Sequence, residues 1–491
     1  MGACCQSSDV KEDNIRRMES ISRRKSSILF EKFSKQSDYR KKYEFIQILG
    51  NGGFGKVRLY KDKKCPSLKY AIKTIKKDFF NKHSILSIIR EVEIIRKLDH
   101  PNIVNYFETY EDEHYLRIVM EYVPGDNLLK IISQKTYKDF NESDICQILT
   151  VLVKTVQFLH NNQIIHRDLK PENILFSITG DYKSMKVIDF GLSIEKQEYD
   201  NCRVGSPYYM APEMINGEFY YESDIWSIGV ILYLMVTGHY AFYAKHKRKL
   251  FDKIKEGKYN NERLNEVSCS EELKDLIRKL LIVNHKKRLS IQGILEHPFF
   301  KLKTNIIKEH KLDSKIIDSL REFNNKNLFQ KEILFLMARI SKESEIHKLR
   351  EAFEIIDKDK TGEIKYSEIP IIFQKIGIKP NEGEIDNIWN SLDFHQDGKI
   401  NYTEFLAATI SSIKFEKEEK LWSVFQYFDE DDDGFISGDS IINALKINND
   451  LNIQEKELSN LLKGLSDSKF DFEEFKKIFF DDNYIDHKNT N

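Results

Sequence analysis

Three acidic twelve-residue segments, set 36 residues apart, restrict the folds that this chain can adopt more than any other feature. They begin at Asp357, Asp393 and Asp429, and each has a glycine at its sixth position and an isoleucine at its eighth. Alternating oxygen ligands around a sharp glycine turn form the loop that holds Ca²⁺ between two helices. One such loop could be a solvated turn, but three in register predict paired helix–loop–helix units. The sequence therefore predicts an all-α, calcium-binding region.

The first two loops carry nearly complete ligand sets. The first offers side-chain oxygens of Asp357, Asp359 and Thr361, the carbonyl of Glu363 and the closing carboxylate of Glu368. The second offers Asp393, His395, Asp397, the carbonyl of Lys399, Asn401 and Glu404. Because His395 stands where an acid is usual, we expect weakened but retained binding in the second loop.

The remaining loops are less complete. The third offers Asp429, Asp431, Asp433, the carbonyl of Phe435 and Ser437, but it ends in Ser440, so we expect weak or Mg²⁺-tolerant binding. A degenerate fourth loop has Lys463, Leu465 and Ser468 at ligand and turn positions, retains Asp471 and Glu474, and is expected to be a structural partner only. The eighth residues, Ile364, Ile400, Ile436 and Phe470, predict a short β-link within each pair of loops.

A second constellation predicts phosphoryl transfer. Residues 166–173 read His-Arg-Asp-Leu-Lys-Pro-Glu-Asn, and an Asp-Phe-Gly triplet begins at Asp189. Asp168 can accept a proton from a hydroxyl nucleophile, Lys170 can hold the transferring group, and Asn173 can ligate Mg²⁺. An Ala-Pro-Glu triplet at residues 211–213 follows, which makes chance resemblance a poor explanation.

A glycine-rich turn between β-type runs precedes these motifs. Glycines at positions 50, 52 and 55 would let the backbone approach a triphosphate, and Lys73 follows in Tyr-Ala-Ile-Lys. Such a glycine pattern also occurs in dinucleotide-binding turns. Those turns open a helix, however, whereas Val57 to Tyr60 reads as a strand, which favours a phosphate-covering turn.

Together the motifs resemble the calcium-dependent protein kinases of plants and protists, over about residues 43–480. The resemblance implies that Glu91, rather than the nearby Glu93, pairs with Lys73, and that Asn173 and Asp189 hold Mg²⁺. The ATP-contacting residues it implies are Leu49, Gly50, Asn51, Gly52, Gly53, Phe54, Gly55, Val57, Ala71, Lys73, Met120, Glu121 and Val123. It further implies an ion pair between Glu213 and Arg288.

The same resemblance divides the chain into parts. We expect a disordered basic arm (1–42), a protein kinase domain (43–300), an autoinhibitory junction (301–345), a calmodulin-like domain with four EF-hands (346–480) and a tail (481–491). The implied architecture is an α+β bilobal protein kinase fold followed by an all-α EF-hand domain. In the junction, Phe329, Ile333, Leu336, Met337 and Ile340 form one helical stripe, which is typical of a core helix and also of a calmodulin-type target.

Two segments of the kinase domain depart from the usual pattern. Asn127 stands where related kinases carry the acid that reads a substrate arginine, so a strong arginine preference is in doubt. Between Ile194 and Gly205 no Ser or Thr occurs. We expect Glu198 or Asp200 to pair with Arg167 and to make activation-loop phosphorylation unnecessary, with phosphorylation of Tyr199 as the alternative.

Composition restricts partners and location. A formal charge of −1 over 491 residues gives no bias toward nucleic acid. Of the six cysteines two are adjacent and the other four are scattered, so they form no disulfide framework, which favours the cytosol. Gly2, Cys4 and Cys5 resemble an N-myristoylation site with palmitoylatable cysteines, although Gln6 stands where Ser or Thr is usual; an unmodified tail is the alternative. We expect a cytoplasmic protein attached to the cytoplasmic face of a membrane.

The function that follows is transfer of the ATP γ-phosphate to Ser or Thr of protein substrates, with Mg²⁺ and under control of Ca²⁺. The junction would block the kinase at low calcium, and the protein's own EF-hands would remove the block. Two alternatives remain: a catalytically dead, calcium-responsive scaffold, which should lack one of Lys73, Asp168 or Asp189, and a constitutive kinase whose hands are structural or buffers.

Overall fold

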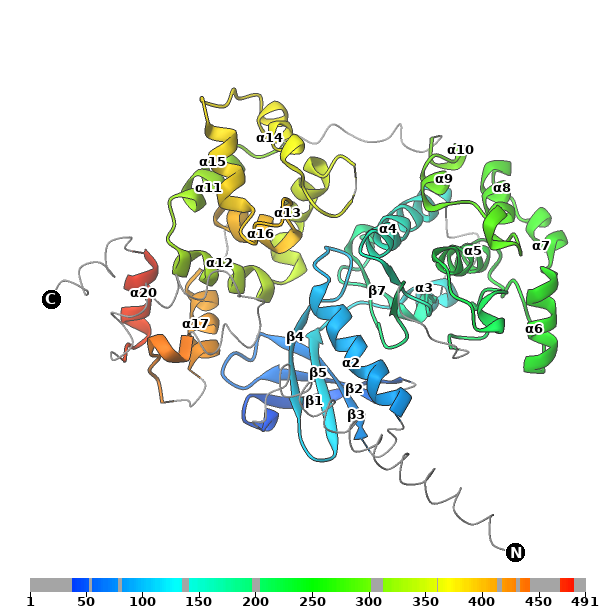
Figure 1. Ribbon diagram of the computed structural model, residues 1–491, viewed down its shortest axis with the longest axis horizontal. Helices are drawn as coiled ribbons and strands as arrows, with labels where there is room; N and C mark the ends of the chain where they lie inside the picture. Colours follow the sequence, from blue (N-terminus) through cyan, green and yellow to red (C-terminus); the bar gives the residue numbers. More distant parts are fainter. Residues whose placement is uncertain are drawn as a thin grey trace, which may run out of the picture. The chain divides into compact units, whose positions relative to one another are not determined.

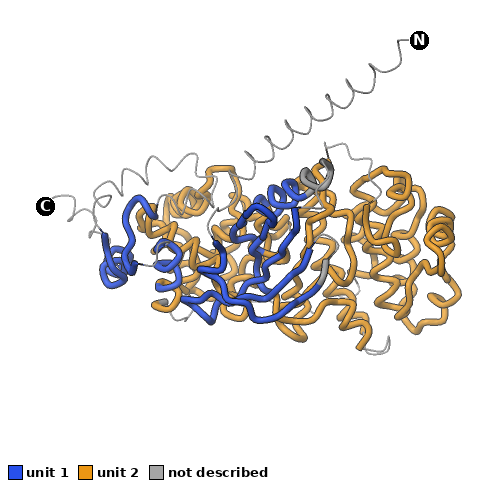
Figure 2. Tube along the Cα trace, turned by 90° about the horizontal axis from the view of Figure 1, so that it is seen from below, with its two compact units in different colours: residues 1–97, 105–122, 422–491 blue, residues 98–104, 123–421 orange. Residues whose placement is uncertain are grey.

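The computed structural model describes residues 38–52, 55–77, 82–134, 141–196, 204–301, 312–359, 361–412, 417–429, 433–441 and 469–480. Figure 2 shows two compact units. The first contains the described parts of residues 1–97, 105–122 and 422–491, and the second contains residues 98–104 and 123–421. Gly2, Cys4, Cys5, Gly53, Phe54 and Asp431 lie outside the described residues, as do Glu198, Tyr199 and Asp200.

The first unit is built on one antiparallel five-stranded sheet (Figure 1). Its strands are β1 (Tyr43–Gly52), β2 (Gly55–Asp62), β3 (Lys69–Lys76), β4 (Tyr106–Glu111) and β5 (Tyr115–Glu121), in the order β1-β2-β3-β5-β4, and helix α2 (Lys82–Lys97) follows β3. The register pairs Val57 with Lys73 and Ala71 with Met120, which sets residues implied in ATP contact on neighbouring strands.

An aromatic cluster stabilises this sheet. Tyr43, Tyr70 and Tyr110 are buried, and burial raises the pKa of Tyr43. The 3₁₀ helix η1 (Tyr39–Lys41) adds Tyr39, whose ring lies 5.9 Å from that of Tyr60 and 4.4 Å from the Arg117 guanidinium carbon. Residues 38–42 therefore pack against this sheet, directly before the kinase domain predicted to begin at residue 43.

The same unit contains part of the third and fourth hands. Helix α17 (Lys417–Phe428), whose residues from Trp422 onward belong to this unit, packs against α20 (Phe472–Phe480). Trp422 stacks on Phe425, and both rings contact Phe472. The predicted β-link between Ile436 and Phe470 is formed as an antiparallel bridge.

The second unit begins with the helical part of the kinase domain. Its helices are α3 (Leu128–Gln134), α4 (Glu142–Asn161), α5 (Tyr221–Thr237), α6 (Lys247–Glu256), α7 (Asn261–Glu266), α8 (Glu271–Leu280), α9 (Ile291–Leu295) and α10 (Pro298–Lys301). Short antiparallel pairs join β6 (Ile164–Ile165) to β9 (Ile194–Glu195) and β7 (Ile174–Phe176) to β8 (Met185–Val187). The 3₁₀ turns are η3 (Pro171–Asn173), η4 (Tyr182–Ser184), η5 (Met214–Asn216) and η6 (His285–Lys287).

Helices α4 and α5 form the centre of this part. The apolar residues of α4 repeat at helical spacing and bury one face, whereas α5 is buried over nearly its whole length, as its continuous apolar run predicts. Asn141 caps α4 by accepting the backbone N–H of Asp144. Among the described helices none combines the length and apolarity that crossing a bilayer requires.

The junction and the first two hands complete the second unit. They comprise α11 (Lys315–Asn324), α12 (Leu328–Ile340), α13 (Glu343–Ile356), η8 (Tyr366–Glu368), α14 (Ile369–Ile376), α15 (Glu384–Leu392), α16 (Tyr402–Thr409) and η9 (Ile410–Ser412). Phe329, Ile333 and Met337 of the predicted stripe are buried, but Leu336 and Ile340 are only partly buried. Leu334 and Phe335 are buried as well, so α12 is enclosed on more than the one face predicted.

A buried ion pair ties α5 to the end of the kinase domain. Arg288 donates to both carboxylate oxygens of Glu213, at 2.8 and 3.0 Å, and both side chains are at most 5% exposed. Ser223 at the start of α5 also donates to Glu213, at 2.9 Å. The pair implied by the motif resemblance is therefore present, and it joins residues 75 positions apart.

Replacing Arg288 by Leu should destabilise the kinase domain by about 3–5 kcal/mol, because it leaves the Glu213 carboxylate buried without its cation. The free energy of opening can be measured by hydrogen exchange of the α5 amides in EGTA. Arg248→Leu, which changes an exposed arginine on α6, is the control and should have little effect. Equal exchange in the two variants would contradict this role.

Candidate active site and calcium loops

In the first unit, Lys73 and Glu91 form the predicted pair. Lys73 Nζ donates to Glu91 Oε1 at 2.6 Å, and the two residues are 4% and 3% exposed. Lys73 extends from β3 and Glu91 from α2. Because each charge is removed from water, each needs the other, and the ammonium group is held in one position. Glu93 is only partly buried, and it is Glu91 that bonds Lys73.

The glycine-rich turn shows where glycine is required. β1 and β2 pair up to Gly52 and Gly55. A Cβ atom on Gly55 would lie 2.3 Å from the carbonyl oxygen of Thr74, so the neighbouring strand excludes a side chain there. At Gly50 no atom of the described residues lies within 4 Å of such a Cβ. The sheet therefore requires glycine at position 55, in addition to the approach to a phosphate that the sequence predicts.

In the second unit, Asp224 fixes the backbone of the catalytic loop. Its carboxylate is fully buried and accepts the backbone N–H groups of His166 and Arg167 at 2.9 and 3.0 Å, and it bonds His160 Nε2 at 2.9 Å. Burial would raise the pKa of Asp224, but the hydrogen bonds and charge of His160 and His166 outweigh it, and the pKa is lowered. Arg167 takes a left-handed φ of 66°, a costly conformation for a non-glycine residue.

Asp168 lies at the centre of a small polar network. Lys170 Nζ donates to Asp168 Oδ2 at 2.5 Å and to Ser206 Oγ at 3.0 Å, and the backbone N–H of Ser206 donates to Asp168 Oδ1 at 2.8 Å. Asn173 Nδ2 donates to the Asp168 carbonyl at 3.0 Å. A carboxylate held beside an ammonium and a backbone N–H can accept a hydroxyl proton while the ammonium balances developing negative charge.

The β7–β8 hairpin places Asp189 beside this loop. The N–H of Ile188 donates to the Asn173 carbonyl at 2.9 Å, and Asp189 follows with a left-handed φ of 66°. The fully buried Phe190 packs on His166, with ring centroids 5.1 Å apart. One carboxylate and one amide oxygen on adjacent segments suit Mg²⁺, which binds through few protein oxygens together with substrate phosphates. Asn173 and Asp189 are therefore the residues that would hold it.

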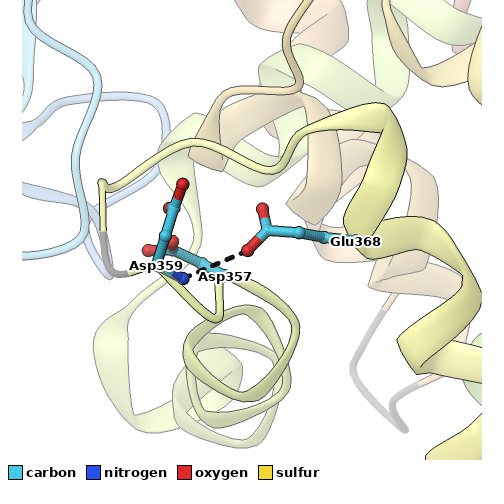
Figure 3. A group of neighbouring side chains, drawn as sticks. All are labelled: Asp357, Asp359 and Glu368. Carbon is cyan, nitrogen blue, oxygen red and sulfur yellow. Dashed lines mark hydrogen bonds between the residues drawn. The ribbon is translucent and has the colours of Figure 1, made fainter.

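The first calcium loop brings its ligands together (Figure 3). Ligand oxygens of Asp357, Asp359 and Glu368 lie within 4.8 Å of one another. Glu368 Oε1 accepts the N–H groups of Lys358 and Asp359, at 2.6 and 3.2 Å, so its carboxylate already spans the loop. Gly362 has a φ of 85°, as the sharp turn demands. The donor set and its convergence fit Ca²⁺.

The second loop is closed by its histidine. His395 Nδ1 bonds Glu404 Oε1 at 2.6 Å, and the His395 N–H donates to the same oxygen at 3.2 Å. This hydrogen bond raises the pKa of His395, while burial raises that of Glu404. His395, which stands where an acid is usual, therefore hydrogen-bonds the closing carboxylate of Glu404 directly. The predicted β-link of this pair is formed between Ile364 and Ile400.

Other predicted residues have plainer roles. The Asn127 side chain accepts the N–H of Lys130 at 2.8 Å, at the start of α3. Arg167 Nε donates to the Leu192 carbonyl, and its guanidinium lies 4.5 Å from the centre of the Phe219 ring. The expected acidic partners of Arg167 and the lipidation residues fall outside the described residues.

Sequence reasoning missed Glu332 on α12. It is 1% exposed, and its Oε1 has no hydrogen-bond partner among the described residues. Burial raises its pKa to about 7, against opposing charges of His395 and Arg339. A glutamate next to an apolar stripe normally marks the solvent face of a helix, so no local signal could have indicated its burial.

These sites define a protein kinase joined to calcium-binding hands. The protein kinase domain model matches residues 43–300, and the EF-hand domain pair model matches residues 346–410. Calcium-dependent protein kinase 19 of Oryza sativa subsp. japonica is 35% identical over 417 residues, covering 83% of this chain and 76% of the relative. Calcium-dependent protein kinase 34 of Arabidopsis thaliana is 34% identical over 445 residues, covering 89% and 84%.

Calcium-dependent protein kinase SK5 of Glycine max is similar to the same extent, 35% over 443 residues, covering 89% of this chain and 86% of the relative. The chain belongs to the calcium-dependent protein kinase family. It is a calcium-activated serine/threonine protein kinase that uses ATP and Mg²⁺ and carries EF-hands for Ca²⁺. The predicted family, fold class and enzyme class are confirmed, and the scaffold alternative is not supported.

Replacing Glu332 by Gln should stabilise the first pair of hands at pH 8 and change it little at pH 4.5. The pKa in the folded protein, about 7, lies above the ordinary glutamate value of 4.5, so the free energy of unfolding falls as pH rises through this interval. This pKa shift corresponds to a loss of roughly 3 kcal/mol in the free energy of unfolding at pH 8. Hydrogen-exchange protection of the α12 and α16 amides in EGTA measures it, with the exposed Glu322→Gln as control. The same gain at both pH values would contradict the prediction.

Proposed function

We propose that the junction region, residues 301–345, blocks the kinase at low calcium and that filling of the first and second loops removes the block. The observation that carries this proposal is the packing of α12 on α16, the helix that closes the second loop. Phe329, Ile333 and Met337 of α12 are at most 1% exposed. The junction thus already has a partner in the calcium hands, as a target helix has.

Polar contacts also join the junction helices α11 and α12 to helix α15 of the hands. Arg321 of α11 donates to Glu384 of α15 at 2.8 Å, and Lys331 Nζ of α12 donates to Ser391 Oγ at 3.0 Å. A ligand shifts an equilibrium only as far as it binds one state better. Calcium that orders the helices of the first two hands therefore favours the state in which they hold α11 and α12.

The same hands also touch the kinase domain within the second unit. The Thr403 N–H at the start of α16 donates to Asp99 at 3.0 Å, and Arg350 of α13 pairs with Asp181 at 3.0 Å. Gly362 of the first loop lies so close to His100 that a Cβ there would meet the imidazole at 2.5 Å. A change in the first two loops can therefore reach residues 98–104, which follow α2, by direct contact.

In the transfer reaction each polar residue has one role. Asp168 orients the substrate hydroxyl and accepts its proton, and Lys170 stabilises the negative charge that develops on the transferring group. Lys73, fixed by Glu91, grips the ATP phosphates. Mg²⁺ bound by Asn173 and Asp189 would neutralise phosphate charge.

The loop assignment predicts which variants lose calcium control. Glu368→Gln and Glu404→Gln each remove one closing carboxylate oxygen and should raise the calcium concentration for half-maximal activity by about tenfold or more. Ser440→Ala in the third loop is the matched control and should leave it unchanged. Calcium binding, measured by calorimetry on the same proteins, should weaken in parallel. Unchanged calcium dependence of the activity in Glu368→Gln would contradict the assignment of the first loop as a calcium sensor.

We propose further that the arm attaches the kinase to the cytoplasmic face of a membrane, through myristate on Gly2 and palmitate on Cys4 and Cys5. The support is the sequence alone: Gly2 follows the initiator Met, and the cysteines follow closely. A single acyl chain binds membranes only marginally, so both modifications are needed for stable attachment.

Gly2→Ala should move the protein from the membrane to the soluble fraction of a eukaryotic cell lysate. The double variant Cys4→Ser/Cys5→Ser should keep the myristoyl chain and show intermediate, reversible binding. Incorporation of an alkyne-tagged myristate, read on a gel, tests the modification itself. Retention of Gly2→Ala on membranes would contradict acylation as the anchor.

A further inference from the structure

In the first unit, the third hand lies against the turn between β2 and β3. Cys65 of this turn donates its thiol to Gln426 Oε1 at 2.9 Å, and Ser423 Oγ donates to Cys65 Sγ at 3.3 Å. Cys65 is 7% exposed and Ser423 is 8% exposed. The two side chains lie within hydrogen-bond reach inside a closed contact between the kinase sheet and α17.

The contact continues to the first ligand position of the third calcium loop. Lys64 Nζ donates to the Asp429 carbonyl at 3.1 Å and lies 3.6 Å from the carboxylate oxygen Oδ2. Asp429 is only 5% exposed. Lys42 Nζ, which pairs with Glu108 at 3.0 Å, lies 5.3 Å from the centre of the Tyr427 ring. Cations of the kinase sheet thus face the end of α17 and the start of the loop.

The described end of the loop is held by hydrogen bonds and an ion pair between protein groups. The Ser437 N–H donates to Ser440 Oγ at 2.8 Å, and the Ser440 N–H donates to Ser437 Oγ at 3.1 Å. Lys469 pairs with the Asp433 carboxylate and lowers its pKa. The first two loops close through a glutamate that spans them, but a serine has neither the length nor the second oxygen to do so. This donor set fits Ca²⁺ poorly.

We propose that the third hand is a docking element rather than a calcium sensor, and that Lys64 holds its first-position carboxylate, Asp429, whether or not calcium is present. The sequence led us to expect weak calcium binding here, and this proposal replaces that expectation. It refines the proposed calcium gating, on which it depends for the sensing role of the first two loops. The C-terminal hands then stay fixed on the sheet while the first pair responds.

A disulfide tests the contact in the full-length protein. Ser423→Cys places a second thiol beside Cys65, and diamide should join them; peptide mapping by mass spectrometry identifies the bond. The rate of bond formation reports how often the two surfaces meet, so it should agree within about twofold between EGTA and calcium. Cys65→Ser in the same background is the blank.

Lysine variants in the Ser423→Cys background identify the contact that holds the hand. Lys64→Ala should slow cross-linking by about fivefold or more, because the hand is then less often docked. Lys63→Ala, which changes the exposed neighbouring lysine, should leave the rate unchanged. Equal rates in the two lysine variants, or a rate that calcium changes more than about fivefold, would overturn the proposal.

Calcium stoichiometry gives a second measurement that does not depend on the cysteine variant. Equilibrium dialysis of the unmodified chain should find about two ions per chain, and Asp433→Asn should not change that number. A third ion that Asp433→Asn removes would overturn the proposal. Neither measurement uses phosphorylation, so a failure of calcium gating would be seen separately, in the activity assay.

Discussion

The catalytic loop depends on the carboxylate of Asp224, which accepts two consecutive backbone N–H groups and a histidine ring nitrogen inside the protein. These bonds hold Arg167 in a left-handed conformation that would otherwise cost on the order of 1–3 kcal/mol. The next residue, Asp168, is thereby directed toward Lys170 and the N–H of Ser206. The fully buried Asp224 thus determines where Asp168, the proposed proton acceptor, lies.

In the calcium hands, too, a carboxylate that accepts backbone N–H groups shapes the loop; here it is the glutamate at the closing position. Glu368 and Glu404 each accept backbone N–H groups across their own loop, so the glutamate at the predicted closing ligand position also shapes the loop. His395 modifies this arrangement in the second loop by bonding Glu404 directly. In the third loop Ser440 bonds Ser437 instead, and Lys64 of the kinase sheet meets Asp429. The same repeated sequence pattern therefore forms two loops suited to calcium binding and a third that, by our proposal, docks on the kinase domain.

Motifs predicted the contacts whose partners sit at fixed places in a known fold. Lys73 with Glu91, Glu213 with Arg288, and the Ile364–Ile400 link are all formed. The two ion pairs were implied by the resemblance to a known family, and the link between the isoleucines was predicted by the loop pattern, although the partners are far apart in sequence. The division into kinase domain and hands was visible for the same reason.

Other contacts left no local signal. Lys64 and Asp429 are 365 residues apart, and an exposed turn lysine is the ordinary interpretation of such a residue. The burial of Glu332 depends on how α12 is enclosed, which a helical period cannot show for a helix buried on several faces. At Gly55 the glycine pattern gave no sign that the adjacent Thr74 carbonyl also excludes a side chain. Tertiary packing decided all three.

The central claim is that calcium bound by this chain's own hands controls its catalytic loop. The most direct test is phosphorylation of a Ser/Thr peptide by the purified full-length protein with ATP and Mg²⁺, first in EGTA and then in calcium, with Asp168→Asn as the blank. The account predicts activity in calcium and little in EGTA. Equal activity in both conditions would contradict it, because the hands would then not govern the kinase.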